Sequence, residues 1–203
     1  MQDVSTRKFQ ETILAFEREI YELNANPKVS FDTVINKVIT NMELLIPGSL
    51  CTILQLNDNN TVKHIAGYSL DHNYIRAIDG LEIGPVSGSC GTAMYSAKSI
   101  FVDDIENSEL WEPFHPIIKP YGFKACWSVP VKKRTGKVMA SFAVYFKEVR
   151  APQKIEINLL ERVANLVGVL IENRNAFEET ESAKERYDIV AKATSDTIWD
   201  WKI

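Results

Sequence analysis

The chain has 203 residues, of which 45% are hydrophobic, 10% aromatic and 25% charged. This composition is typical of packed globular domains and excludes disorder along the whole chain. Its 23 basic and 27 acidic side chains leave a formal net charge of -4, without the cationic surplus that nucleic acids or anionic membranes would attract, so neither partner is expected.

Two helices are predicted at the start of the chain, where no glycine occurs before Gly48. The first, over residues 1–25, is amphipathic: its apolar side chains recur at alternating steps of four and three over residues 9–23. Such a narrow stripe is typical of a helix that packs against another helix. The second, over residues 31–45, has a broad apolar face suited to a domain core and ends before Pro47.

Extended runs separated by turn residues predict four strands and a short fifth. The predicted strands are residues 50–56, 61–66, 99–102, 124–131 and 137–147. The last run is apolar on both faces, with Phe142 and Val144 on one side and Ala143 and Tyr145 on the other. A strand of this kind is expected to lie centrally in a sheet that is covered on both faces.

After Pro152 a long helix is predicted, and from Leu160 to Phe177 it repeats the narrow apolar stripe of the first helix. After Phe177 the apolar residues no longer follow this spacing, and a second apolar stripe begins in a different register. This change indicates a helical linker over residues 174–186. Because both terminal helices carry such a stripe, a parallel homodimer through these helices is expected.

Four short motifs occur in a fixed order: GSCGTA at 88–93, VDDI at 102–105, LW at 110–111 and GFKACWSVP at 122–130. With the order of the predicted elements, they resemble bacterial GAF sensory domains over residues 26–173. The resemblance implies an α+β fold with a central six-stranded antiparallel sheet. The terminal helices would cover one face, and loops and short helices would cover a ligand cavity on the other.

The end of the chain resembles the opening of a PAS domain, chiefly in the run AKATSDTIWDW at 191–201. Residues 187–203 are therefore expected to be the start of a truncated PAS domain within a longer signalling protein. By family analogy, that protein is a sensor histidine kinase or else a diguanylate cyclase. No secretory signal or membrane-spanning run is present in the sequence, so a cytoplasmic location is expected.

The face of the sheet away from the terminal helices is predicted to bind a small molecule. Strand alternation places Cys126 and Ser128 on this face and Trp127 on the other. The expected ligand-binding residues are Ser89, Cys90, Gly91, Thr92, Trp111, Phe114, His115, Ile118, Cys126, Ser128, Ser141, Ala143 and Tyr145. A mostly apolar cavity with a few polar groups is the usual form of such a site. The alternative is a filled secondary core in a ligand-free dimerisation scaffold.

The glycine-rich loop before residue 93 has two interpretations. Its backbone N–H groups at a helix start suit an anionic or carbonyl ligand, or its glycines serve only to turn the chain tightly. Cys90 is likewise either a reactive thiol at a helix start or an inert packing residue. With Cys51 and Cys126 it makes an odd set of three without a C-x-x-C pair, so all three are expected to be reduced.

Catalysis is not expected, although free methionine-(R)-sulfoxide reductases are GAF proteins that share the Cys-Gly-Thr-Ala string. Their chemistry requires a resolving thiol and acidic residues that hold the substrate. Here Gly80 stands where the resolving cysteine would be, and Ala143 and Tyr145 stand at the acidic positions. No catalytic residue is therefore assigned.

His115 is either a haem or ligand contact or a polar edge residue, and its lack of a second His or Cys nearby argues against a metal site. Bilin-binding GAF domains carry a cysteine next to a histidine in this segment, but the neighbour here is Phe114. The pattern of cyclic-nucleotide-binding relatives is also missing. No cofactor is identified from the residues.

Overall fold

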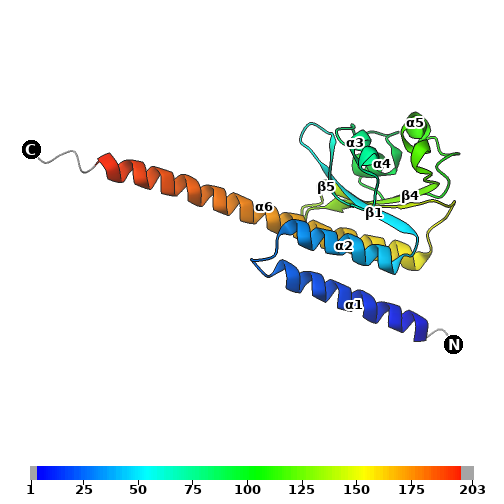
Figure 1. The fold of residues 1–203 in the computed structure, drawn as a ribbon, viewed down its shortest axis with the longest axis horizontal. Helices are drawn as coiled ribbons and strands as arrows, with labels where there is room; N and C mark the ends of the chain where they lie inside the picture. Colours follow the sequence, from blue (N-terminus) through cyan, green and yellow to red (C-terminus); the bar gives the residue numbers. More distant parts are fainter. Residues whose placement is uncertain (1–3, 198–203) are drawn as a thin grey trace, which may run out of the picture.

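The computed structural model describes residues 4–197 and contains one five-stranded antiparallel sheet (Figure 1). Its strands are β1 (Ser49–Leu56), β2 (Val62–Ala66), β3 (Ile100–Val102), β4 (Ala125–Lys132) and β5 (Val138–Phe146), in the spatial order β2-β1-β5-β4-β3. All five predicted strands are thus confirmed, and β5 lies centrally as its two apolar faces indicated.

Helices cover both faces of the sheet (Figure 1). On one side lie α1 (Val4–Asn24), α2 (Phe31–Leu45) and α6 (Lys154–Thr197). On the other side lie α3 (His72–Ile78), α4 (Gly88–Ser96) and α5 (His115–Ile118), the last flanked by the short 3-10 turns η1 (Glu112–Phe114) and η2 (Lys119–Tyr121). The α+β architecture is confirmed, and α2 has the predicted bounds because Ser30 caps it by accepting a hydrogen bond from the Thr33 N–H.

The expected sixth strand is not found among the described residues. Backbone hydrogen bonds of 2.8–2.9 Å join residues 80–83 to residues 60–62 beside β2, but only Thr61 and Glu82 form a bridge. Gly80, at the start of this segment, has a φ of +84°, which takes the backbone out of the extended conformation. Pro85 then removes a donor where it would continue, so the segment stays a loop.

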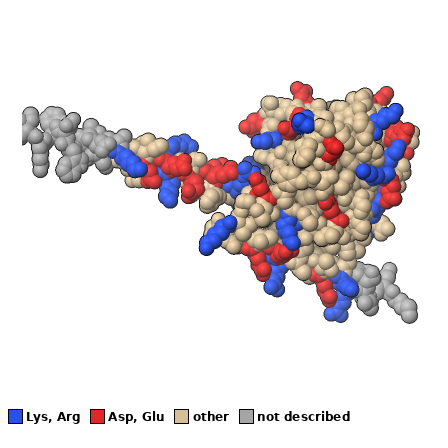
Figure 2. Space-filling model, viewed as in Figure 1, with Lys and Arg blue, Asp and Glu red and all other residues tan. Residues whose placement is uncertain are grey.

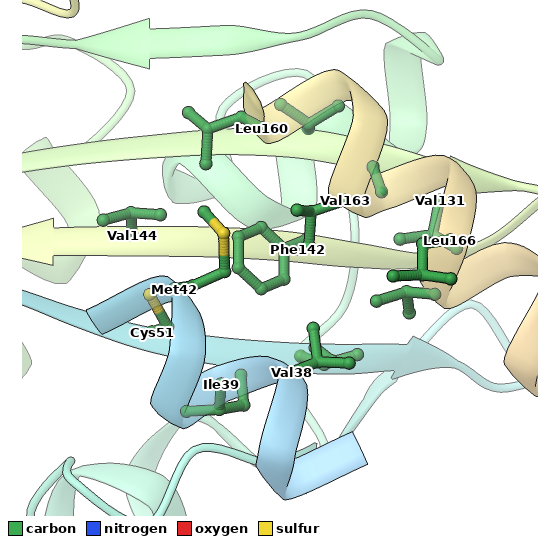
Figure 3. Packing of buried hydrophobic residues seen from close by; sticks show 14 of the residues in the cluster. Val38, Ile39, Met42, Cys51, Val131, Phe142, Val144, Leu160, Val163 and Leu166 are labelled. Carbon is green, nitrogen blue, oxygen red and sulfur yellow. The ribbon is translucent and has the colours of Figure 1, made fainter. Parts of the chain in front are cut away.

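The core on the helical side is built from α2, α6 and alternate residues of the sheet. Figure 3 shows Phe142 of β5 close to Met42 of α2 and Val163 of α6, and all three are at most 1% exposed. The glycine at position 168 brings α6 close to β4, since a Cβ there would lie 2.8 Å from the Lys132 carbonyl oxygen. This core therefore joins the helices and the sheet into one rigid unit.

The alternation of β5 shifts at one residue near its start. Val131 pairs with Ala140, but Lys132 pairs with Val138, so Met139 is an extra residue opposite β4. Met139 consequently joins the helix-side core, and Val138 packs on the opposite side. Strict alternation along this strand predicted Val138 on the helix side and Met139 on the opposite side. That prediction was wrong because it did not allow for the bulge.

The apolar stripe of α1 packs within the chain. Ile13, Phe16 and Ile20 are buried in the helix-side core. A Glu17–Arg162 ion pair with an N–O distance of 2.7 Å adds a link between α1 and α6. The prediction that this stripe meets another helix is right, but that helix belongs to the same chain.

The last helix, α6, is continuous over 44 residues, about 66 Å at 1.5 Å per residue. Its first part packs in the core, and the Arg174 guanidinium lies 4.6 Å from the centre of the Phe31 ring. Beyond it Phe177 is 65% exposed, and the helix runs on alone (Figure 1). The phase change near residue 177 does not interrupt the helix. The predicted PAS start lies partly outside the described residues, at 198–203.

Charges of both signs are interspersed over the face shown in Figure 2 and along α6. No large patch of one sign is visible on that face. Within residues 4–197, none of the helices combines the length and apolar character needed to cross a membrane.

Candidate functional site

The face of the sheet opposite α2 and α6 supports a second buried core, formed with α3, α4 and the segment around α5. Six of the predicted site residues belong to it, namely Cys90, Trp111, Ile118, Cys126, Ala143 and Tyr145. Cys126 and Tyr145 are cross-strand partners, and Trp127 lies in the helix-side core. The strand alternation therefore places the central residues of β4 and β5 correctly.

A cavity of about 40 Å³ lies within this second core, with room for roughly three water molecules. Five of the predicted residues line it, namely Cys90, Gly91, Trp111, Phe114 and Tyr145. Small-molecule pockets usually have about 300–1,000 Å³. The structure thus shows a space mostly filled by aromatic side chains rather than the metabolite-sized cavity that was expected.

Tyr74 of α3 is the chief contributor that the sequence analysis missed. It is 1% exposed, and its hydroxyl donates a hydrogen bond to the Tyr145 hydroxyl at 3.1 Å. Its ring packs against Phe123 and Tyr121 with centroid distances of 5.3 and 5.1 Å. Burial raises the pKa of both Tyr74 and Tyr145 well above the ordinary value, so both remain neutral at physiological pH.

Trp111 closes the cavity beneath the start of α4. Its indole Nε1–H donates to the Ser89 hydroxyl at 3.0 Å, and that hydroxyl donates to the Cys126 carbonyl at 2.9 Å. The indole meets the rings of Phe114 and Tyr145 edge to face, with centroid distances of 6.3 and 6.4 Å. Ser89 thus acts as a link between Trp111, α4 and β4, and it does not line the cavity.

The glycine-rich loop is closed by protein groups and does not present an open anion cradle. The Gly88 N–H donates to the Leu110 carbonyl at 2.9 Å, and the Ser87 N–H donates to the Thr92 hydroxyl at 3.1 Å. A Cβ on Gly91 would lie 2.5 Å from the Ser87 hydroxyl oxygen. Packing therefore explains Gly91 and Thr92, and the interpretation as a tight turn is favoured.

His115 does not face the cavity, contrary to the prediction. Its Nε2 lies 3.0 Å from the Ile105 carbonyl oxygen, and it lines a separate surface hollow of about 220 Å³ with Lys124 and Ile118. The turn formed by η1 and α5 directs Phe114 to the cavity and the next residue outward. Sequence spacing alone does not reveal this rotation. Among the described residues, no group of three or more metal-ligating side chains is close enough to hold a metal.

A small polar group lies under α4, where Cys90 is surrounded by Cys126, Tyr145, Ser128 and Ser141. The Cys90 sulfur lies 3.6 Å from the Tyr145 hydroxyl oxygen. The Cys126 thiol, followed by the hydroxyls of Tyr145, Ser128 and Ser141, favours the Cys90 thiolate and lowers the pKa of Cys90 to about 7, although burial opposes this. Burial raises the pKa of Cys126 well above the ordinary value, so Cys126 stays a thiol.

Comparison with known proteins shows that a sensor protein is among the relatives of this chain. It is 27% identical over 198 residues to the methyl sulfide methyltransferase-associated sensor of Methanosarcina acetivorans, a match that covers 97% of this chain. The chain spans about one fifth of the length of that curated relative, since the match covers 20% of it.

Solved structures share the fold at low sequence identity. The GAF domain of a phosphoenolpyruvate-protein phosphotransferase from Coxiella burnetii has a TM-score of 0.70 and 16% identity, covering 83% of this chain and 98% of that one. A domain assigned to a two-component sensor histidine kinase of Sinorhizobium meliloti has a TM-score of 0.63 and 18% identity, covering 75% and 97%. The free methionine-R-sulfoxide reductase of Neisseria meningitidis has a TM-score of 0.66 and 12% identity, covering 87% and 96%.

The match to a protein family covers far more of the chain than any single motif does. Residues 28–172 match the GAF domain family, a range close to the 26–173 that the motifs indicated and well over half of the chain. The whole second core lies within this range, and so does the helix-side core apart from its α1 residues. The chain therefore belongs to the GAF domain family.

Proposed function

We propose that this chain is the sensory input module of a signal-transduction protein, in which the second core receives the signal and α6 passes it on. Membership of the GAF family and a relative named as a sensor support the sensory role. The chain itself is proposed to be regulatory and not catalytic. The full-length protein is proposed to be a cytoplasmic sensor histidine kinase, since a domain from a two-component sensor histidine kinase is among the structural neighbours of this chain.

The observation that carries the proposal is that β4 and β5 are buried on both faces. Cys126 and Tyr145 project into the second core, whereas the adjacent Trp127 and Val144 project into the core that holds α6. Because close-packed layers transmit strain, a change in packing on one face alters the other. The two strands thus provide a short mechanical path from the cavity to the start of α6.

A ligand at this site is proposed to be small, or else to displace an aromatic side chain. A volume of about 40 Å³ admits roughly three waters, so a larger ligand requires Trp111 or Phe114 to move. Apart from Glu82 at the surface end, the polar side chains that line the cavity carry hydroxyls and a thiol, which favour a neutral ligand over a fully ionised one.

A specific observation favours a second candidate, a ligand-free scaffold. Tyr74, Trp111, Phe123 and Tyr145 already pack against one another in the space where a metabolite was expected. In this alternative the second core only stabilises the sheet. The module would then serve as a spacer between other domains or as a dimerisation unit.

Dimerisation is proposed to occur through the projecting part of α6. Most of the two stripes that first suggested a dimer packs within the chain, but Phe177 at the end of the second stripe is 65% exposed, and Tyr187 and Ile189 further along the helix are 75% and 67% exposed. Analytical ultracentrifugation of this chain tests the idea. Parallel pairing predicts a dimer that Phe177→Glu weakens, whereas a monomer at high protein concentration would contradict it.

Ligand sensing is tested by native mass spectrometry of the freshly purified chain, followed by thermal-shift screening of small neutral metabolites. A sensor is expected to retain a molecule or to be stabilised by one, and Tyr145→Phe should reduce that stabilisation. Tyr68→Phe, at a residue that is 62% exposed, is the matched control. If no compound is retained and none stabilises the chain, the scaffold is the better account.

A further inference from the structure

Two of the three cysteines lie together beneath α4, although 36 residues separate them in the sequence. Cys90 is in the first turn of α4, and Cys126 is in β4 directly opposite Tyr145. The Ser89 hydroxyl donates to the Cys126 carbonyl at 2.9 Å, so the start of α4 is held against β4. The Cys90 sulfur lies 3.6 Å from the hydroxyl oxygen of Tyr145, the cross-strand partner of Cys126, so the two thiols belong to the same buried cluster.

The two thiols differ in access. Cys90 is 6% exposed and lines the cavity, which reaches the exposed residue Glu82 at the surface. Cys126 is fully buried behind it and does not line the cavity. A small reagent that enters the cavity therefore reaches Cys90 first.

Two buried serine hydroxyls beside Cys90 are a further indication that this sulfur can carry a polar group. Ser128 and Ser141 are 0% exposed, and within residues 4–197 neither hydroxyl oxygen has a partner in hydrogen-bonding geometry. Both lie near enough to Cys90 to favour its thiolate. A buried hydroxyl without a partner is destabilising, and an oxygen added to the Cys90 sulfur would supply the missing hydrogen bond.

We propose that Cys90 and Cys126 form a redox site that a small peroxide converts to an intramolecular disulfide. The Cys90 thiolate attacks one oxygen of hydrogen peroxide, the O–O bond breaks, and hydroxide leaves as Cys90 becomes a sulfenic acid. The Cys126 sulfur then attacks the Cys90 sulfur, losing its proton as water leaves. In total, two thiols are oxidised, one peroxide is reduced, and two water molecules form.

The two thiols suit these separate steps. The lowered pKa of Cys90 makes it the attacking thiolate near neutral pH, while Cys126 keeps its proton until the second step. Ser128 and Ser141 are placed to donate hydrogen bonds to the oxygen that is added to Cys90. Formation of the disulfide would also shift Ser89, which is next to Cys90 and bonded to the Cys126 carbonyl. Because the Ser89 hydroxyl accepts the Trp111 indole N–H, oxidation would change the packing of the second core.

The test is oxidation of the folded 203-residue chain with hydrogen peroxide, followed by alkylation of free thiols, digestion without reductant and mass spectrometry. The expected product is a peptide pair cross-linked between Cys90 and Cys126, lighter than the separate peptides by two hydrogens. Cys51→Ala is the matched control. Cys51 is buried on the opposite side of the sheet, where burial raises its pKa, so this variant should form the same cross-link.

Further variants separate the two steps. Cys126→Ala should stop at a Cys90 sulfenic acid that dimedone traps, and Cys90→Ala should leave Cys126 unmodified. The proposal is overturned if both thiols stay free at peroxide levels that oxidise cysteine-containing peptides. It is equally overturned if Cys90 proceeds to sulfinic acid with Cys126 still free. Because cross-linking is measured on the chain itself, failure would leave the proposed sensory role standing.

Discussion

Replacing Trp111 with alanine tests whether the second core is packed as described. The indole is 5% exposed, fills the space under α4 and donates a hydrogen bond to Ser89 at 3.0 Å. Its removal leaves Phe114 and Tyr145 without their edge-to-face partner. The variant is expected to fold but to lose much of the stability contributed by this side of the sheet.

The magnitude follows from the buried surface. An aromatic side chain buries about 150–250 Å², which at about 25 cal/mol per Å² corresponds to about 4–6 kcal/mol. Residual burial in the unfolded chain lowers this figure by roughly 10–40%, which agrees with the 3–5 kcal/mol typical of Trp→Ala changes. We therefore expect Trp111→Ala to reduce the free energy of unfolding by about 3–5 kcal/mol.

Urea denaturation followed by circular dichroism measures this change without relying on tryptophan fluorescence. Trp111→Phe keeps an aromatic ring but loses the donor to Ser89, so its loss should be only about 1–2 kcal/mol. Tyr68→Ala, at a residue that is 62% exposed, should change stability by less than about 0.5 kcal/mol. A loss below about 1.5 kcal/mol for Trp111→Ala, with an unchanged denaturant slope, would refute the packing argument.

Three further changes probe other parts of the account. Arg150→Ala removes the partner of Glu156 in the first turn of α6 and a guanidinium 4.5 Å from the Phe146 ring, so urea denaturation should show a loss of about 2 kcal/mol. Gly168→Ala forces α6 away from β4 and should cost about 1–2 kcal/mol in the same assay, despite the higher helix propensity of alanine. Alkylation of Cys90 by iodoacetamide should rise only about tenfold from pH 6 to pH 8, because a pKa of about 7 leaves some thiolate at pH 6. An ordinary thiol would show roughly a seventyfold rise, which would contradict the lowered pKa.

Much of the fold was predictable because its signals are local. The bounds of α2 follow from a broad apolar face between Ser30 and Pro47, and the strands follow from alternation between turn residues. The missed features depend on partners distant in sequence. The bulge at Met139 exists only relative to β4, and residues 80–83 make only one bridge with the segment beside β2, between Thr61 and Glu82.

The candidate site was predictable to the extent that strand alternation controls it. Cys126 and Tyr145 lie as the alternation of β4 and β5 indicates. His115 does not, because the direction of a side chain on a short turn depends on how that turn packs. Tyr74 was missed although Asp71 caps α3 and Ile78 follows at helical spacing, two signals that would have revealed the helix.

Coupling between the second core and α6 is the central claim, and indole binding to Trp111→Ala tests it most directly. Indole should refill the vacated space, as a thermal shift would show, and hydrogen exchange is then compared with and without it. The account predicts slower amide exchange both in α4 and in the buried part of α6, residues 159–171. Bound indole that slows exchange in α4 while leaving α6 unchanged would contradict it.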